Sequence, residues 1–312
     1  MDDGMSESDA VLNGNMCFSC ELMSLLLARS AVASQSGDVA ELDLMARWPV
    51  LAAAILVAGL VADVWLAWQW WQRRKTASAP LWRVGTKPWG LSELFVAVGV
   101  TLAVFLSVGI VGGLLRLRAT GLLALLGATE LGLLLVFLIC LEVERVDFRH
   151  AFGLTESSVP HALWMGGVFF LAVQPPLLVL STLRDKLYAW LGWQVSTQDI
   201  VRMFLTADSR SLTVVLVGFA LLVAPVCEEA FFRGLAYPAL KKRWGVPTAL
   251  VVVSALFALI HFHGPSLPLL FVLAVGLTLA YEYTGSLLTP IAMHAAFNSL
   301  NVMALLLYRS HP

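Results

Sequence analysis

Long apolar stretches recur along this chain of 312 residues, and they restrict its fold more than any other feature of the sequence. Hydrophobic residues make up 59% of the chain and charged residues only 13%, against roughly 25% charged residues in soluble domains. Helical segments of about 20 apolar residues match the thickness of a bilayer. The sequence therefore predicts an all-α polytopic membrane protein with about eight transmembrane helices.

The apolar segments divide the chain into four parts. Residues 1–47 are mixed and acidic, and they predict a poorly ordered or membrane-surface extension. Residues 48–183 predict variable transmembrane helices, at about 48–71, 91–115, 120–141 and 162–183. Residues 184–210 are amphipathic and predict an interfacial segment. Residues 211–308 contain the remaining apolar helices, and they carry the polar residues that matter most below.

Three charged residues lie inside the apolar stretch APVCEEAFFRGLAYPAL, at positions 228, 229 and 233. An ionisable side chain near a bilayer centre costs at least about 2.5 kcal/mol, so it normally faces the protein interior or a wet cavity. Glu229 and Arg233 are four residues apart with the acid first, which favours an ion pair. Glu228 lies about 100° around the helix and can present its carboxylate elsewhere. A buried ion-pair network that only joins two helices is the alternative interpretation.

Pro225 precedes the two glutamates within the same long apolar stretch. Proline favours the first turn of a helix, where carboxylates are also stabilised by the helix dipole. We therefore expect one membrane crossing to end near Pro225 and the helix with the glutamates to begin there.

Two later apolar segments also carry polar side chains at helical spacing. Phe257 and His261 are four residues apart in SALFALIHFHG, and His294 and Asn298 are four apart in IAMHAAFNSL. A single such pair more often belongs to a hydrogen-bonded core or an interhelical contact. Three such elements in the last third of the chain favour one common site, because desolvated polar groups need partners.

In order and spacing, these residues resemble the motifs of the CPBP (Abi) family of intramembrane proteases, which includes the type II CAAX prenyl endopeptidases. The pattern is Glu-Glu-x-x-x-Arg at 228–233, Phe-x-x-x-His at 257–261 and His-x-x-x-Asn at 294–298. The resemblance covers about residues 211–305. It implies an α-helical membrane fold with the catalytic cavity in the C-terminal helices.

The resemblance also implies a role for each motif residue. Glu228 would be the catalytic carboxylate and would activate a water molecule together with His261. His294 and Asn298 would form the oxyanion hole for the scissile carbonyl. The supporting residues would be Glu229, Arg233 and Phe257. The extra histidine, His263, is expected in a loop or at the interface.

The residues leave the cofactor open between none and Zn²⁺. Glu228, His261 and His294 can supply three zinc ligands and leave a fourth position for water. The helical H-E-x-x-H arrangement is absent from the sequence, however, which favours a glutamate-activated water without metal. Cys17 and Cys20 form one isolated C-x-x-C, a weak metal or redox signal without a second half.

The first functional hypothesis is an intramembrane endopeptidase acting on a membrane-embedded or lipid-anchored substrate. Its expected partners are membrane lipid and a peptide or lipidated protein; 20 basic against 21 acidic residues favour no nucleic acid. An integral membrane protein is expected, in the cytoplasmic membrane of a prokaryote or the endoplasmic reticulum of a eukaryote.

Two other classes compete with a protease. A non-proteolytic membrane scaffold or bacteriocin-immunity-type protein can use the same fold, but it has no need of Glu228 or Asn298. A proton- or ion-coupled transporter also places carboxylates and histidines in its spans. The sequence lacks the internal repeat of many transporters and gathers its polar residues in one third of the chain, which disfavours that class.

Overall fold

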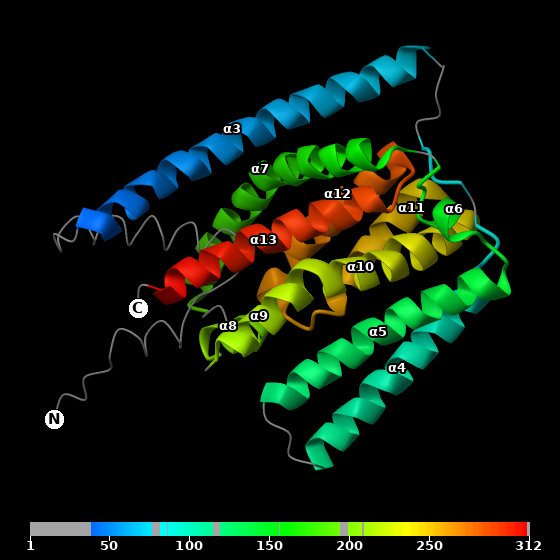
Figure 1. Ribbon diagram of the computed structural model, residues 1–312. Helices are drawn as coiled ribbons and strands as arrows, with labels where there is room; N and C mark the ends of the chain where they lie inside the picture. Colours follow the sequence, from blue (N-terminus) through cyan, green and yellow to red (C-terminus); the bar gives the residue numbers. More distant parts are fainter. Residues whose placement is uncertain are drawn as a thin grey trace.

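The computed structural model describes residues 39–76, 82–85, 87–114, 119–155, 157–193, 199–207 and 209–310. Every regular element in those ranges is a helix (Figure 1). Most of the predicted extension at residues 1–47, including Cys17 and Cys20, lies outside the described residues.

The helices are named here in the order in which they occur along the chain. They are α3 (Val39–Thr76), α4 (Leu91–Leu114), α5 (Ala119–Val143), α6 (Phe148–Ala151), α7 (Val159–Leu191), α8 (Asp199–Leu205), α9 (Arg210–Gly218), the π-helix η1 (Phe219–Val223), α10 (Ala224–Glu229), the π-helix η2 (Ala230–Ala236), α11 (Tyr237–Leu259), the 3₁₀-helix η3 (Gly264–Ser266), α12 (Leu267–Thr284) and α13 (Leu288–Ser310).

The long helices pack side by side as a bundle (Figure 1). Helix α3 packs on α7, which packs on α12 and α13; α10 packs on α13 and, from its other side, on α5, which pairs with α4. Helices α10, η2, α12 and α13 therefore form the centre of the bundle, between α7 and α5. The C-terminal helices that carry the motif residues occupy this central position.

The membrane fold predicted from the sequence is confirmed. Among the described residues, six segments are long and apolar enough to cross a membrane, and one of them is the 50-residue run Arg210–Leu259. That run reverses at Gly245 and so supplies two helical legs, and α5 adds a further helix of 25 residues. Counting both legs and α5 gives eight, in line with the expected number.

Helix α7 is longer than the predicted span at 162–183. It runs from Val159 to Leu191, so the first part of the segment predicted as interfacial continues this helix. The charge that suggested a membrane boundary is neutralised locally, because the buried Arg184 pairs with its neighbour Asp185. Because the charge of Arg184 is paired with Asp185, this arginine lies within the helix and does not mark its end.

The chain reverses at Gly245, and the expectation that a crossing ends at Pro225 is wrong. Helical structure continues past Pro225 because η1 is wound as a π-helix, in which the Ala224 N–H donates to the Phe219 carbonyl five residues back. Gly245 has φ 77° and ψ 175°, a conformation essentially restricted to glycine.

The aromatic contacts across Gly245 require this reversal. In a straight helix Phe232 and Phe257 would lie about 37 Å apart at 1.5 Å per residue. Their ring centroids are 5.2 Å apart. The second leg of α11 therefore folds back along η2 and brings the Phe257–His261 motif to the glutamates.

Glu282, in the last turn of α12, joins several segments at one end of the bundle. Its Oε1 accepts hydrogen bonds from Lys241 Nζ and from the Tyr237 hydroxyl, both at 2.5 Å. Its Oε2 accepts the Val84 backbone N–H at 3.1 Å. Because each carboxylate oxygen is occupied, this buried acid holds α11, α12 and the segment before α4 together rather than presenting a reactive group.

The turn between α12 and α13 is held by the loop after α6. The Phe152 carbonyl accepts the Leu287 backbone N–H at 3.0 Å and the Ser286 hydroxyl at 3.3 Å. Gly153 allows this approach, since an added Cβ would lie 2.1 Å from the Gly285 carbonyl oxygen. This contact fixes the start of α13. It therefore also fixes the position of His294 along the axis of the bundle.

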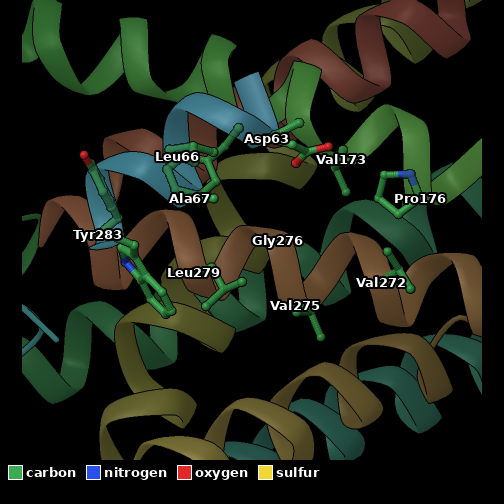
Figure 2. A pocket seen from close by; sticks show the side chains of 13 residues that line it. Asp63, Leu66, Ala67, Val173, Pro176, Val272, Val275, Gly276, Leu279 and Tyr283 are labelled. Carbon is green, nitrogen blue, oxygen red and sulfur yellow. The ribbon is translucent and has the colours of Figure 1, made fainter. Parts of the chain in front are cut away.

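An apolar pocket of about 290 Å³ lies between α3, α7 and α12 (Figure 2). Its walls include Trp70, Val173, Leu279 and Tyr283, and Asp63 contributes a single carboxyl. None of the motif residues lines it. The pocket therefore lies apart from the polar site that the sequence predicts.

We expect Gly245→Ala to destabilise the protein by about 1 to 3 kcal/mol, because any Cβ opposes the observed φ and ψ. No atom lies within 4 Å of the added Cβ, so the cost comes from the backbone alone. Thermal unfolding in detergent measures it. Gly218→Ala is the matched control: it also has open space but ordinary helical angles, and it should be neutral or slightly stabilising. Equal stability of the two variants would contradict the role given to Gly245.

Candidate active site

The two consecutive glutamates lie at the junction of α10 and η2, in the centre of the bundle. Glu228 is 8% exposed and Glu229 is fully buried. The π-helices η1 and η2 flank this short α-helix on either side. π-Helical turns are rare and are frequently found at functional sites, so the local backbone itself points to this region.

The ion pair expected from the four-residue spacing is formed. Arg233 Nη1 donates to Glu229 Oε1 at 3.0 Å, and both side chains are fully buried. Arg233 Nη2 donates to the Ala274 carbonyl on α12 at 3.0 Å, and the guanidinium lies 4.9 Å from the centre of the Phe257 ring. Arg233 thus joins η2, α11 and α12 around one charge.

Glu229 also binds His294, which gives it a second task beyond the ion pair. The His294 Nδ1 lies 2.9 Å from the same Glu229 Oε1. A carboxylate only accepts, so this contact places the proton on Nδ1 and leaves Nε2 at the far end of the ring. Nε2 lies 4.0 Å from Glu228 Oε2. Glu229 therefore orients the imidazole that faces Glu228.

His261 lies at the end of α11, and its ring is also fixed through Nδ1. That nitrogen is 2.7 Å from the Phe257 carbonyl oxygen, which can only accept, so Nε2 is the end available for chemistry. The Phe257 ring lies 4.9 Å from the His261 ring and 5.9 Å from the His294 ring, centre to centre. The Phe257 ring thus contacts the rings of both histidines. Of the two, His294 is the one that approaches Glu228 to 4.0 Å.

Asn298 lies one helical turn after His294 on α13. Its Nδ2 donates to the Ala220 carbonyl of η1 at 2.8 Å. This contact uses one amide hydrogen and leaves the second. The π-helix η1 thus belongs to the candidate site, because its Ala220 carbonyl holds the Asn298 amide.

Glu130 on α5 is a third acid of the site, and the motifs did not single it out. Helix α5 packs on α10, and Glu130 interacts electrostatically with Glu228. The thiol of Cys227 on α10 is close enough to both acids to feel their charge. The signal was present in the sequence: Glu130 lies in the middle of the apolar span predicted at 120–141, where an ionisable residue marks function by default.

The geometry does not fit the zinc alternative. Within the part of the chain that the structure describes, no three His, Cys, Asp or Glu side chains are placed to share a metal ion. His294 Nδ1 is directed to Glu229 and His261 Nδ1 to a backbone carbonyl, so each histidine could bind a metal only through Nε2. We therefore derive no metal-dependent step.

A buried carboxylate, two histidines held through Nδ1 and an asparagine amide gather in this part of the bundle, and the family comparison matches the same region. Residues 210–300 match the family model described as type II CAAX prenyl endopeptidase Rce1-like. This stretch contains all seven motif residues, and the resemblance stated from the motifs is confirmed. No curated protein and no solved structure matches the chain.

The apolar helices indicate an integral membrane protein, and its C-terminal third is similar to the CAAX-type intramembrane protease family. The matched region begins with α9 and ends within α13. Helix α5, which carries Glu130, lies before it. The site therefore combines the residues of the matched domain with one acid from the preceding helices.

Glu229→Ala should destabilise the protein by about 3 to 5 kcal/mol, because it leaves the buried Arg233 without its counter-charge. Chemical unfolding in detergent micelles measures the change. Glu142→Ala removes an exposed acid at the end of α5 and should stay within about 0.5 kcal/mol of the parent. A Glu229→Ala protein as stable as the Glu142→Ala control would show that the ion pair does not support the fold.

Proposed function

We propose that this protein hydrolyses a peptide bond of a membrane-embedded or lipid-anchored substrate, with Glu228 as the catalytic carboxylate. One observation carries the proposal: Glu228 Oε2 is buried, has no protein hydrogen-bond partner among the described residues, and faces His294 Nε2 at 4.0 Å. An acceptor in such surroundings normally finds a donor. In a hydrolase, a water molecule or the substrate can donate this hydrogen bond to Glu228 Oε2.

In the proposed first step, Glu228 takes a proton from water with the help of His261, whose Nε2 is the available ring nitrogen. The water oxygen forms a bond to the carbonyl carbon, and the carbonyl becomes an oxyanion. A carboxylate desolvated beside imidazoles suits this proton transfer. In the second step the C–N bond breaks, and the proton held by Glu228 goes to the leaving amine.

His294 and Asn298 are the proposed donors to the oxyanion. Glu229 fixes the His294 ring so that Nε2 points to the reacting side. In the imidazolium form, which carries a proton on both nitrogens, Nε2 donates from there. Asn298 has one amide hydrogen left after its bond to Ala220. Donors that are held in place before the reaction stabilise the transition state most, because they need no reorganisation.

The 4.0 Å between Glu228 Oε2 and His294 Nε2 suits this division of roles. The attacking oxygen and the oxyanion belong to the same tetrahedral carbon, so the base and the donor must stand close without being bonded to each other. A direct hydrogen bond of about 2.9 Å would tie them together. The observed spacing leaves each group free for its own oxygen.

The substrate class follows from where the site lies and from the family. The carboxylates are in the middle of a membrane bundle, so the scissile bond must reach them from within or beside the bilayer. The matching family is named for CAAX prenyl endopeptidases. A prenylated C-terminal peptide is therefore the first substrate to test, and a transmembrane peptide the second.

Glu228→Gln should abolish cleavage of a membrane-tethered reporter in proteoliposomes. His261→Ala and Asn298→Ala should each lower kcat by about 10²- to 10³-fold, since each removes a group that acts in the transition state. His263→Ala is the control and should keep its activity, because that ring bonds Ser266 in the loop before α12. Melting curves show that the variants are folded. Full activity of Glu228→Gln would refute the proposal and favour a non-proteolytic scaffold.

The proposal also predicts that purified enzyme cleaves the reporter after exhaustive chelation, at a zinc content far below one ion per chain. Metal analysis of the assayed sample gives the content directly. Loss of activity on chelation and its return with added Zn²⁺ would contradict the glutamate-activated water.

A further inference from the structure

Asp63 on α3 is an acid that neither the packing of the bundle nor the proposed hydrolysis uses. It lies in the middle of the span Val50–Lys75, ten residues before Arg73, the first residue of the basic cluster that ends the helix. At about 1.5 Å per residue it lies about 15 Å deeper than that cluster, or half of a hydrocarbon core of about 30 Å. An ionisable side chain at this depth normally has a partner or a function.

The Asp63 carboxyl has no partner within the described part of the protein, where it makes neither a hydrogen bond nor an ion pair. Arg73, the next basic residue along the same helix, is engaged by Tyr283 on α12. Its Nη1 donates to the Tyr283 carbonyl at 3.2 Å, and its guanidinium lies 3.7 Å from the centre of the Tyr283 ring. The positive charge that α3 could offer to Asp63 is therefore used elsewhere.

Asp63 belongs to the wall of the apolar pocket between α3, α7 and α12. Figure 2 shows the Asp63 carboxyl and the Tyr283 side chain at different ends of this pocket. Of the described residues that line it, none is a Lys, Arg or His, and Asp63 is the one acid. A ligand of this pocket therefore meets apolar walls and a single carboxyl, which lies at the deep end.

The pocket can be reached from the surrounding lipid. On α12 its wall is formed by the half-buried Val272, Val275 and Leu279, and on α3 it includes the exposed Ala67. A ligand can thus enter from the side without opening the bundle. The volume of about 290 Å³ lies at the lower limit of small-molecule sites, which have about 300 to 1,000 Å³. A small amphiphile fits this space, whereas a phospholipid with two chains does not.

We propose that the pocket binds a small amphiphilic cation, whose apolar body lies between α3, α7 and α12 and whose ammonium group pairs with the Asp63 carboxylate. Lipid is as apolar as the pocket walls, so the apolar body alone gains little by leaving the bilayer. The charge pair supplies the selectivity, because an ammonium donates charge-assisted hydrogen bonds to a carboxylate and no bulk water weakens them there. This binding does not depend on the proposed hydrolysis.

Two simpler accounts of Asp63 lead to different results. An acid that only faces lipid would give the protein no preference for an amine over an alcohol of the same chain length. An acid with a structural partner would lower the melting temperature of the protein when it is neutralised. Neutralising an acid without a partner should leave the melting temperature unchanged or raise it.

The test measures the binding of decylamine, decanol and decanoate, which share one chain and differ in the head group. Each is titrated into full-length protein in bilayer nanodiscs, and native mass spectrometry counts the bound molecules. Decylamine should bind the parent protein at one molecule per chain, more tightly than the other two. Asp63→Asn keeps the size of the side chain and removes its charge. It should weaken decylamine binding about 10- to 100-fold and leave decanol binding unchanged.

A second variant tests the pocket with the acid intact. Ala67→Leu enlarges a side chain in the pocket wall and should also weaken decylamine binding. Ala54→Leu is the matched control, because it makes the same change at an exposed position of α3 that does not line the pocket. It should bind decylamine like the parent. Melting curves of the three variants show that each is folded.

Four results would overturn the proposal. Equal decylamine affinity of Asp63→Asn and the parent would exclude the charge pair. Unchanged binding by Ala67→Leu would exclude the pocket as the place of binding. Decanol bound by the parent as tightly as decylamine would exclude selection of a cation. A melting temperature of Asp63→Asn clearly below that of the parent would show that this acid supports the fold. None of these measurements uses cleavage of a substrate, so they leave the proposed hydrolysis to its own assay.

Discussion

The buried contact among Arg233, Glu229 and His294 is the interaction on which the rest of the site depends. One carboxylate oxygen, Glu229 Oε1, serves both the guanidinium and the imidazole, at 3.0 and 2.9 Å. The guanidinium reaches α12 through the Ala274 carbonyl. In an apolar interior these contacts have no competing water, so they fix the relative height and rotation of η2, α12 and α13. Glu228 is the next residue in the chain, and its position follows from that of Glu229.

The site residues could be found from the sequence to the extent that they depend on local spacing. Glu229 with Arg233, and His294 with Asn298, follow from the pitch of one helix. The partnership of Glu229 with His294 joins residues 65 positions apart, and no helical period contains it. The same holds for Glu130 and Glu228, which meet only because α5 packs on α10. The free-energy cost of an ionisable group in a membrane marks each of these residues as a candidate site residue. It does not tell which of them lie next to one another in the fold.

The backbone was harder to predict than the side chains. Proline is the usual signal for a break, yet the helix continues through Pro225, and the turn before it is wound as a π-helix. Glycine alone is a weak signal in a chain with 23 of them. Gly245, however, follows the basic residues Lys241, Lys242 and Arg243 and precedes Pro247. Basic residues at a membrane face and a nearby proline both indicate the end of a helix, so a break near this position could be predicted from the sequence. The helix boundaries of α4 and α5 were predicted well because apolar length alone decides them.

The reversal at Gly245 also bears on how the chain enters the membrane. Residues 210–244 are synthesised before the leg that returns at Gly245, and 61 positions separate Arg233 from His294. During that interval the first leg must reside in the bilayer with its acids and its arginine but without α13. The i,i+4 pair of Glu229 and Arg233 is complete within the first leg, so it neutralises one acid and the arginine from the start. The order of residues along the chain thus lets Glu229 and Arg233 pair as they are inserted, before His294 is made.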